Sequence, residues 1–212
     1  MKIALGMITK NEKFFLERHL SIIAPCFEYF IAIDAESDDG TVEILQSYGA
    51  EIFSRSWNNN FGEARSFCAN KAEEKGYDWL FMLDADECMF KEGIEEAKLF
   101  MNNEENEFLL FPRIEFVGDT KHFNSKIFPD FQGRAIKLKL DYHWRGTIHE
   151  IVYKGNNPEA ISKYTIVPNA MIFHYGWALD IERKYARYYP GQPIPDLLTN
   201  PILREYVGRQ PV

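Results

Sequence analysis

Short apolar runs alternate with helical patterns over the first hundred residues. The runs have the length of strands, and they lie at 3–8, 29–33, 51–54 and 79–83. In the intervening and following segments apolar side chains recur every three or four residues, which predicts helices at 12–23, 41–48, 61–75 and 93–103. Strands that alternate with helices predict a parallel, Rossmann-like sheet with right-handed crossovers.

The pattern changes after residue 103. Strand-like runs then follow one another with few helical segments between them, at 108–117, 123–128, 134–138 and 148–153, before a helix predicted at 179–189. We interpret these runs as antiparallel strands that extend the sheet. Five of the ten prolines lie at or after Pro190, so the end of the chain is predicted to be a strap or linker.

These patterns predict one domain at 1–190 and a Pro-rich strap at 191–212. The domain divides into halves at 1–103 and 104–190. The strap also leads us to expect that further domains of a longer polypeptide follow.

Polar clusters follow three of the predicted parallel strands. They begin at Thr9, at Asp34 and at Asp84, directly after the apolar runs. In open α/β sheets, ligands bind outside the carboxyl ends of the strands. The sequence therefore predicts a ligand site where these three clusters meet.

Asp84 and Asp86 are the strongest candidates for a metal site. Alternate residues of an extended chain point the same way, so both carboxylates can reach one hard cation. Such a cation can bridge a diphosphate and neutralise its charge as it leaves. The alternative is a solvated acidic turn, but the position after an entirely apolar strand favours metal binding.

The acidic loop at 34–41 has two interpretations. Asp34 and Glu36 could accept hydrogen bonds from a base or ribose, beside a helix start that favours an anion. The loop could also simply cap the helix, and Asp39 is the better candidate for the cap.

Composition narrows the choice of partners and compartment. Twenty-four Lys and Arg against 32 Asp and Glu give a net charge of −8 without a basic run, which excludes nucleic acid and anionic lipid as partners. A metal-bridged anion remains compatible with this charge. The odd set of three cysteines lacks metal-type spacing, and no apolar run reaches the ~18 residues of a membrane span. We therefore expect reduced thiols, no membrane span and a cytoplasmic location.

Several segments together resemble a known enzyme family. In order they are MITKNE at 7–12, DAESDDGT at 34–41, WNNNFGEAR at 57–65 and WLFMLDADE at 79–87. This series resembles family 2 glycosyltransferases of GT-A fold, particularly their small bacterial and viral branch. GTIHE at 146–150 and HYGW at 174–177 resemble later motifs of that branch. The size and the Pro-rich end also resemble the N-terminal domain of larger chlorella-virus glycosyltransferases.

The resemblance implies an α/β, GT-A (Rossmann-like) mixed sheet flanked by helices. Its N-terminal half would bind the nucleotide, and a smaller antiparallel half would bind the acceptor. By the same resemblance Thr9, Asp34 and Glu36 would hold the nucleoside, and Arg65 would approach the ribose or diphosphate. Many relatives carry two adjacent acids after the second strand, whereas this chain has Ala35 at the second position, so Glu36 would substitute.

The resemblance also implies a reaction. Asp84, Asp86 and His174 would hold Mn²⁺ or Mg²⁺, and Asp84 would also face the donor. The donor would be a nucleoside-diphosphate sugar, UDP-linked, and the acceptor a hydroxyl of a glycan or glycoprotein, with inversion at the anomeric carbon. Apart from the resemblance, such a transfer needs a carboxylate opposite the leaving diphosphate, and Glu150 could be this general base or an ordinary solvated strand residue, with Asp141 and Asp119 as rival carboxylates.

Two other functions remain open at this point. A nucleotidyltransferase would need a Gly-rich, basic loop after the first strand, and 7–12 contains neither a Gly pair nor an Arg. A catalytically silent module could bind a nucleotide sugar or glycan for a partner domain, but the presence of both Asp84 and Asp86 argues against loss of the metal.

Overall fold

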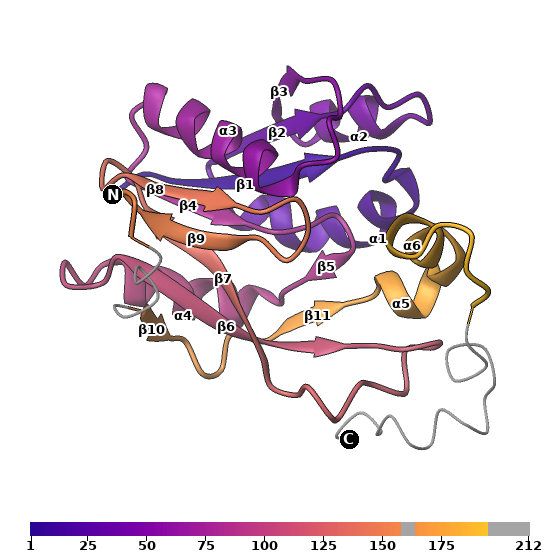
Figure 1. Ribbon diagram of the computed structural model, residues 1–212. Helices are drawn as coiled ribbons and strands as arrows, with labels where there is room; N and C mark the ends of the chain where they lie inside the picture. Colours follow the sequence, from indigo (N-terminus) through magenta and orange to yellow (C-terminus); the bar gives the residue numbers. More distant parts are fainter. Residues whose placement is uncertain (158–163, 195–212) are drawn as a thin grey trace.

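The computed structural model describes residues 1–157 and 164–194 (Figure 1). The elements of the first half are β1 (Ile3–Thr9), α1 (Lys13–Ile23), η1 (Ala24–Cys26), β2 (Tyr29–Asp34), α2 (Thr41–Ser47), β3 (Glu51–Ser54), α3 (Phe61–Glu74), β4 (Trp79–Met82), β5 (Glu87–Cys88) and α4 (Lys91–Met101). The elements of the second half are β6 (Phe108–Glu115), β7 (Asp130–Lys137), β8 (Tyr142–Arg145), β9 (Ile151–Lys154), β10 (Tyr164–Ile166), β11 (Ile172–His174), α5 (Gly176–Leu179) and α6 (Ile181–Tyr188).

Within the described residues, nine strands form one mixed sheet in the order β3-β2-β1-β4-β7-β6-β11-β5, with β10 beside β6. β1 is parallel to both β2 and β4, and β2 is parallel to β3. The register pairs Thr9 with Asp34 and Asp34 with Ser54, so these strands end together. Their common carboxyl edge is where the predicted polar clusters lie.

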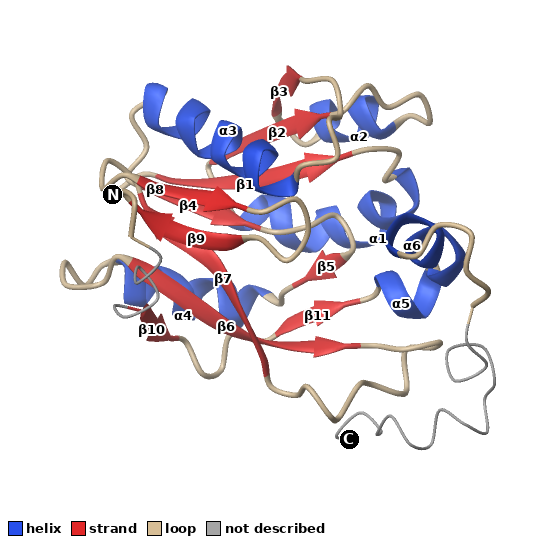
Figure 2. Cartoon of the chain, in the orientation of Figure 1, coloured by secondary structure: helices blue, strands red, loops and turns tan. Residues whose placement is uncertain are grey.

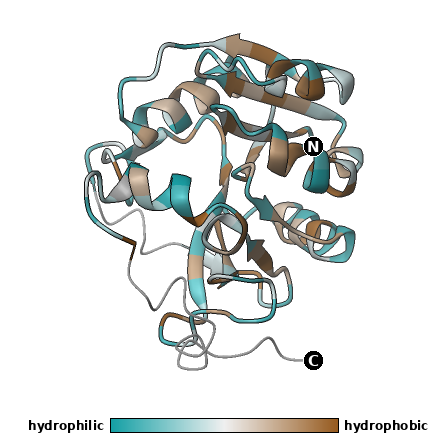
Figure 3. Ribbon diagram, turned by 90° about the vertical axis from the view of Figure 1, so that its right-hand side faces the viewer, coloured by the Kyte–Doolittle hydropathy of each residue, from teal (hydrophilic) through white to brown (hydrophobic). Residues whose placement is uncertain are grey.

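Helices cover both faces of the sheet (Figure 2). The core on one face contains side chains from α1, α2 and α4, and the core on the other face contains side chains from α3 and the β8–β9 hairpin. β4 supplies both, since Phe81 packs into the first core while Leu80 and Met82 pack into the second. A strand covered on both faces has no polar side, which explains its unbroken apolar run. Coloured by hydropathy, the helices show mixed ribbons, as expected for elements with one solvent face (Figure 3).

The prediction for the first half is confirmed. The strands and helices expected there are present with ends shifted by no more than a few residues, and the four strands are parallel. The mixed α/β fold with helices on both faces is confirmed as well.

The second half requires corrections. The strand expected at 123–128 is absent from the described structure, where a single bridge from Phe116 to Phe123 is followed by a turn. The helix expected at 179–189 is present as α6, and the short helix α5 at Gly176–Leu179, which was not predicted, precedes it. The half is also not purely antiparallel, because β10 and β11 both run parallel to β6. Most of the predicted strap, 195–212, lies outside the described residues.

Across the described ranges, each helix is too short or too polar to cross a bilayer.

Candidate active site

The loops after β1 and β2 are tied together at the carboxyl edge of the sheet. The Asn11 amide donates to Ser37 Oγ at 2.8 Å, and Asn11 Oδ1 accepts from the Asp38 amide at 3.0 Å. Asn11 and Glu36 have φ values of 55° and 60°, in the left-handed region that costs non-glycine residues about 1 kcal/mol or more. Such strained backbone clusters at binding sites, because the surrounding contacts must maintain it.

Thr9 and Asp34 are buried in this edge and bind each other. Thr9 Oγ1 donates to Asp34 Oδ1 at 2.9 Å, and the Ser37 amide and hydroxyl donate to the same carboxylate at 2.9 and 2.6 Å. Thr9 is 1% exposed and Asp34 is 3% exposed. The pair therefore fixes the β2–α2 loop, and its contact with a nucleoside stays a prediction.

Glu36 is exposed and accepts from Ser56 Oγ at 2.8 Å. Beside it, a small recess is lined by Ile8, Ile33, Ala35, Arg55, Ser56, Trp57, Asn58 and Ala64. The recess lies where β1, β2 and α3 meet. Arg55 could not be recognised as a site residue from the sequence, because one Arg after a short strand carries no motif of its own.

Arg65 on α3 joins two carboxylates that the sequence assigned to different roles. Its Nη2 donates to Asp84 Oδ1 and Oδ2 at 2.7 and 2.9 Å, and its Nε donates to Glu150. Arg65 is only 3% exposed. A second guanidinium, that of Arg134 on β7, donates to Asp84 Oδ2 at 2.9 Å. Asp84 is thus held by two arginines.

These contacts set the protonation states. Burial would raise the pKa of Asp84, but Arg65 and Arg134 hold it well below its usual range. Burial would likewise raise the pKa of Glu150, and the charge of Arg65 outweighs it, so that the pKa is lowered. Both carboxylates are therefore ionised at neutral pH.

Glu87 is a fully buried carboxylate that the sequence analysis did not identify. It accepts from Arg134 on β7 and, at 3.2 Å, from Arg113 on β6, and its other oxygen accepts from the Asp84 amide at 3.1 Å. Glu87 therefore fixes the turn that presents Asp84. Its place directly after the DAD sequence was the available signal, but a third acid in the loop does not by itself reveal that its side chain is buried.

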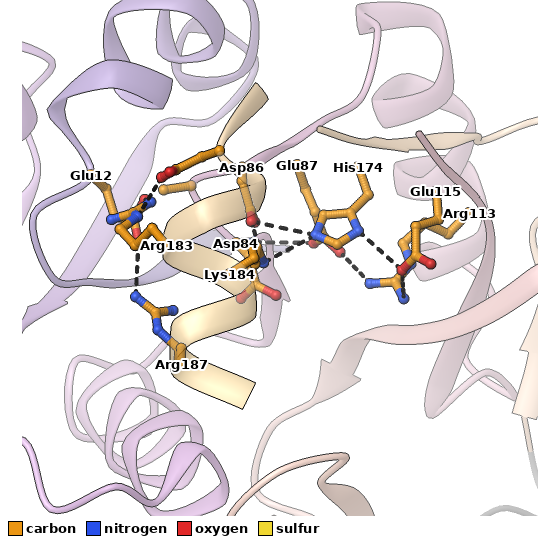
Figure 4. A network of polar contacts seen from close by, with 12 residues as sticks. Glu12, Asp84, Asp86, Glu87, Arg113, Glu115, His174, Arg183, Lys184 and Arg187 are labelled. Atoms are coloured by element: carbon orange, nitrogen blue, oxygen red, sulfur yellow. Dashed lines mark hydrogen bonds and ion pairs between the residues drawn. The ribbon is translucent and has the colours of Figure 1, made fainter. Parts of the chain in front are cut away.

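Asp86 faces a different set of partners (Figure 4). Lys184 on α6 forms an ion pair with Asp86 Oδ2, and His174 Nε2 lies 3.4 Å from the same oxygen. The other ring nitrogen, His174 Nδ1, lies 3.5 Å from Glu115 Oε2. The sheet register explains this arrangement, because His174 on β11 is paired with Glu87 on one side and Glu115 on the other.

The charges around Asp86 are strongly coupled. Burial would raise the pKa of Asp86, but Lys184 and His174 lower it well below its usual range. Burial would lower the pKa of His174, but Asp86 raises it, so the net shift is upward. The Asp86 carboxylate is therefore ionised, and the positive charges of Lys184 and His174 compensate it.

A cleft of about 690 Å³ opens beside Asp84 and beside His174 and Lys184, the partners of Asp86. Its polar lining includes Arg65, Asp84, Glu115, Glu150, His174 and Lys184. Its apolar lining includes Phe131, Ile148, Ile151, Trp177 and Tyr189. A pocket of this size, with convergent charges at its base and apolar walls, suits a nucleotide sugar or another glycan-sized ligand.

The model of the family described as "Glycosyl transferase family 2" matches residues 5–162. The chain belongs to this family. The glycosyltransferase is similar to an uncharacterized glycosyltransferase of Rickettsia typhi, with 27% identity over 211 residues that cover 93% of this chain and 68% of the relative. It is also similar to the SPbeta prophage-derived glycosyltransferase SunS of Bacillus subtilis, with 23% identity over 180 residues that cover 82% of this chain and 40% of SunS.

Solved structures support the fold. A crystal structure of TarS from S. aureus superposes with a TM-score of 0.58 at 15% identity and covers 97% of this chain and 70% of that one. The predicted glycosyltransferase class and GT-A-like fold are thereby confirmed. A chlorella-virus origin receives no support from these comparisons.

The residues around Asp86 can hold a divalent cation. Asp86 Oδ2 and His174 Nε2 are 3.4 Å apart, and two ligands about 2.1 Å from one cation lie about 3.0–3.5 Å apart. The ammonium group of Lys184 already lies against both atoms as a positive charge. Mg²⁺ typically uses one or two carboxylates and completes its shell with substrate phosphates and water. Two protein donors therefore fit.

One of the three predicted metal ligands, Asp84, does not face the other two in the structure. Asp84, the third predicted ligand, is turned toward Arg65 and Arg134. Among the described residues, no group of three or more His, Cys, Asp or Glu side chains is arranged to hold a metal. Because Asp84 is bound by Arg65 and Arg134, only Asp86 and His174 of the three predicted ligands are left as candidates for metal binding.

The rival bases lie away from the cleft. Asp141 is exposed at the start of β8, whereas Trp144 near the other end of that strand lines the cleft. Asp119 accepts hydrogen bonds from the backbone amide and ring of His122. Glu150 lines the cleft itself.

Proposed function

We propose that this domain transfers a hexose from a nucleoside-diphosphate sugar, UDP-linked, to a hydroxyl group of a glycan or glycoprotein, with a divalent cation and inversion. One observation carries the proposal. His174, which contacts Asp86 and with it suits a cation, lines the same cleft as the ionised Glu150, and Arg65 joins Glu150 to Asp84. Group transfer needs this separation of a leaving-group site from a base.

The donor diphosphate is assigned to the Asp86 side of the cleft. Mn²⁺ or Mg²⁺ held by Asp86 and His174 would neutralise negative charge on the diphosphate as it leaves. The nucleoside is assigned to the edge formed by Thr9, Asp34 and Glu36, beside the recess under Trp57. Structures of TarS are described as complexes with UDP and with UDP-GlcNAc, which supports uridine donors as the first to test.

Glu150 is assigned the role of general base. It must be ionised to accept the proton of the attacking hydroxyl, and its lowered pKa keeps it so at neutral pH. Arg65 positions this carboxylate through Nε and positions Asp84 through Nη2. Arg65 therefore fixes the base relative to the donor side, which contributes to the rate through orientation.

The test is release of free nucleoside diphosphate from a panel of nucleotide sugars, with Mn²⁺, with Mg²⁺ and with EDTA. We expect slow metal-dependent release from a UDP-sugar, abolished in Asp86→Ala. Glu150→Gln should lower transfer to an added acceptor, whereas its matched control Asp141→Asn should not, because Asp141 lies outside the cleft. Metal-dependent donor binding without release, with or without acceptors, would favour the silent binding module. Absence of any donor binding would reject the proposal.

A further inference from the structure

The side chain of Lys184 reaches into the cation site from α6. Lys184 is 9% exposed, and its Nζ forms an ion pair with Asp86 Oδ2 while lying 3.3 Å from His174 Nε2. These two atoms are the donors proposed above for the divalent cation. The ammonium group therefore lies against the atoms that a metal ion would contact.

Gly176 makes room for this lysine. A Cβ atom at Gly176 would lie closer to Lys184 Cε and to Asp86 Oδ2 than real Cβ contacts allow. Gly176 is the first residue of α5 and lies two residues after His174, the last residue of β11. The absence of a side chain at this one position lets Lys184 pass to Asp86.

Arg183, the residue that directly precedes Lys184, attaches α6 to the loop after β1. Arg183 Nη1 donates to the Asn11 carbonyl at 2.6 Å, and its Nη2 donates to Glu12 Oε2 at 2.7 Å. The two helices α5 and α6 lie at the end of the sheet toward which β1 points (Figure 1). Arg183 thus holds α6 in the position from which Lys184 contacts Asp86.

A lysine ammonium and a divalent cation compete for the same carboxylate. The two charges repel, and Asp86 Oδ2 and His174 Nε2 cannot coordinate a metal while the ammonium lies against them. Lys184 lines the cleft, so the oxygens of a bound donor diphosphate would offer its ammonium group another anionic partner. The ammonium could then leave Asp86 and make room for the cation.

We propose that Lys184 occupies the cation position of the donor-free enzyme, so that metal binding requires its displacement and becomes coupled to donor binding. This inference rests on the proposed function, because it takes Asp86 and His174 as the metal ligands. It predicts weak affinity for free metal, strengthened when a nucleoside diphosphate is present. The coupling must be reciprocal, so metal strengthens diphosphate binding by the same factor.

The experiment measures Mn²⁺ affinity of the full chain without any donor, by calorimetry and by the electron paramagnetic resonance signal of free Mn²⁺. Lys184→Met should bind Mn²⁺ at least about tenfold more tightly than wild type, because a charge-assisted contact no longer has to be broken. Arg187→Met is the matched control on the same helix, since Arg187 lies 3.9 Å from Glu12 and contacts no proposed ligand in the described structure. Its affinity should stay within about twofold of wild type.

A second variant, Arg183→Gln, keeps the inference testable if Lys184→Met does not fold. Arg183→Gln removes the attachment of α6 without touching Asp86 and should also tighten Mn²⁺ binding, by less than Lys184→Met. Adding UDP should strengthen Mn²⁺ binding more in wild type than in Lys184→Met. Unchanged or weaker Mn²⁺ affinity in both variants, or no Mn²⁺ binding by any of the proteins, would overturn the inference. Neither result depends on turnover, so it is distinguishable from failure to release nucleoside diphosphate.

Discussion

α3 and α6 each present one basic side chain to the acidic loop after β4, and they do so in different ways. Arg65 on α3 contacts Asp84, and Lys184 on α6 contacts Asp86 (Figure 4 shows the second pair). α3 has 14 residues, and its N-cap Asn60 accepts from the Glu63 amide at 3.0 Å. α6 has eight residues, and in the described structure its N-cap Asp180 makes no side-chain cap hydrogen bond.

The two helices also differ in how they are attached. The start of α3 lies against the loop at 145–147, where the Gly62 amide donates to the Gly146 carbonyl at 3.1 Å and Ser66 Oγ accepts from the Trp144 amide at 2.8 Å. α6 is attached to the loop after β1 chiefly through Arg183. A planar guanidinium bound to two carboxylates suits a permanent clamp, and a single ammonium suits an exchangeable contact. On the proposal for Lys184, Asp84 belongs to the fixed part of the site and Asp86 to its changeable part.

The largest effect expected from this comparison is on activity. Asp86→Asn removes the charge that both Lys184 and the proposed metal require, so nucleoside-diphosphate release should fall about a hundredfold or more, since metal stabilisation of the leaving group is worth several kcal/mol. Release is measured with the best donor of the panel at saturating Mn²⁺. A variant that retains most of the wild-type rate would move the leaving-group site away from Asp86.

The next effect is on stability. Arg65→Met leaves Asp84 and Glu150 without their shared guanidinium, which should lower the free energy of unfolding by about 3 kcal/mol, as for other broken buried ion pairs. Urea unfolding with and without Mn²⁺ provides the contrast. Added Mn²⁺ should stabilise Lys184→Met more than it stabilises wild type, and it should stabilise Arg65→Met only as much as wild type, because the proposed ligands Asp86 and His174 remain in that variant. Equal stabilisation of both variants would contradict the distinction between a fixed and a changeable part.

Glu12 makes the attachment of α6 sensitive to pH. Burial and the nearby charge of Asp86 raise the pKa of Glu12 to about 7, although Arg183 acts in the opposite direction. The folded protein therefore binds a proton more tightly than the unfolded chain between the ordinary value of 4.5 and about 7. Over this window stability declines as pH rises, and the contribution is fully present below the window and lost above it.

Glu12→Gln should remove this dependence. The difference in unfolding free energy between wild type and Glu12→Gln should change by at most about 3 kcal/mol between pH 4.5 and pH 8, with wild type losing stability relative to the variant as pH rises. Urea unfolding at several pH values measures it. Parallel curves for the two proteins would show that Arg183 keeps Glu12 ionised throughout.

The first half was predictable from sequence for a physical reason. β1, β2 and β4 are central, parallel and covered on both faces, so burial alone selected their apolar runs. The acidic clusters follow these strands directly, and their convergence was foreseen from the topology. Side-chain direction was not foreseen, because the partners of Asp84 and Asp86 lie 19 to 98 positions away along the chain.

The second half was harder because its strands are short and set by tertiary contacts. β10 and β11 have three residues each, too few for a period to be recognised, and the same holds for the two-residue β5 of the first half. The run at 123–128 contains enough aromatic and β-branched residues to look like a strand, but these side chains pack as a turn, with Phe123 against Phe128. Arg113 and Arg134 were missed because an arginine within a strand signals nothing until its buried carboxylate partner is known.

The smallest expected effect concerns the N-cap of α3 and tests whether the start of this helix influences Mn²⁺ binding. Asn60→Ala removes the cap of α3 and its second contact, from Asn60 Nδ2 to Glu63 Oε1 at 2.9 Å. Loss of such a cap should lower the free energy of unfolding by about 1 kcal/mol. Mn²⁺ affinity should nevertheless stay within about twofold of wild type, because Arg65 lies beyond the first turn and is held by Asp84 and Glu150. Urea unfolding and Mn²⁺ titration of the same preparation test both parts. If the lost cap altered Mn²⁺ affinity as strongly as Arg183→Gln, the two helices would be equally changeable, and the permanence assigned to the Arg65 clamp would have to be given up.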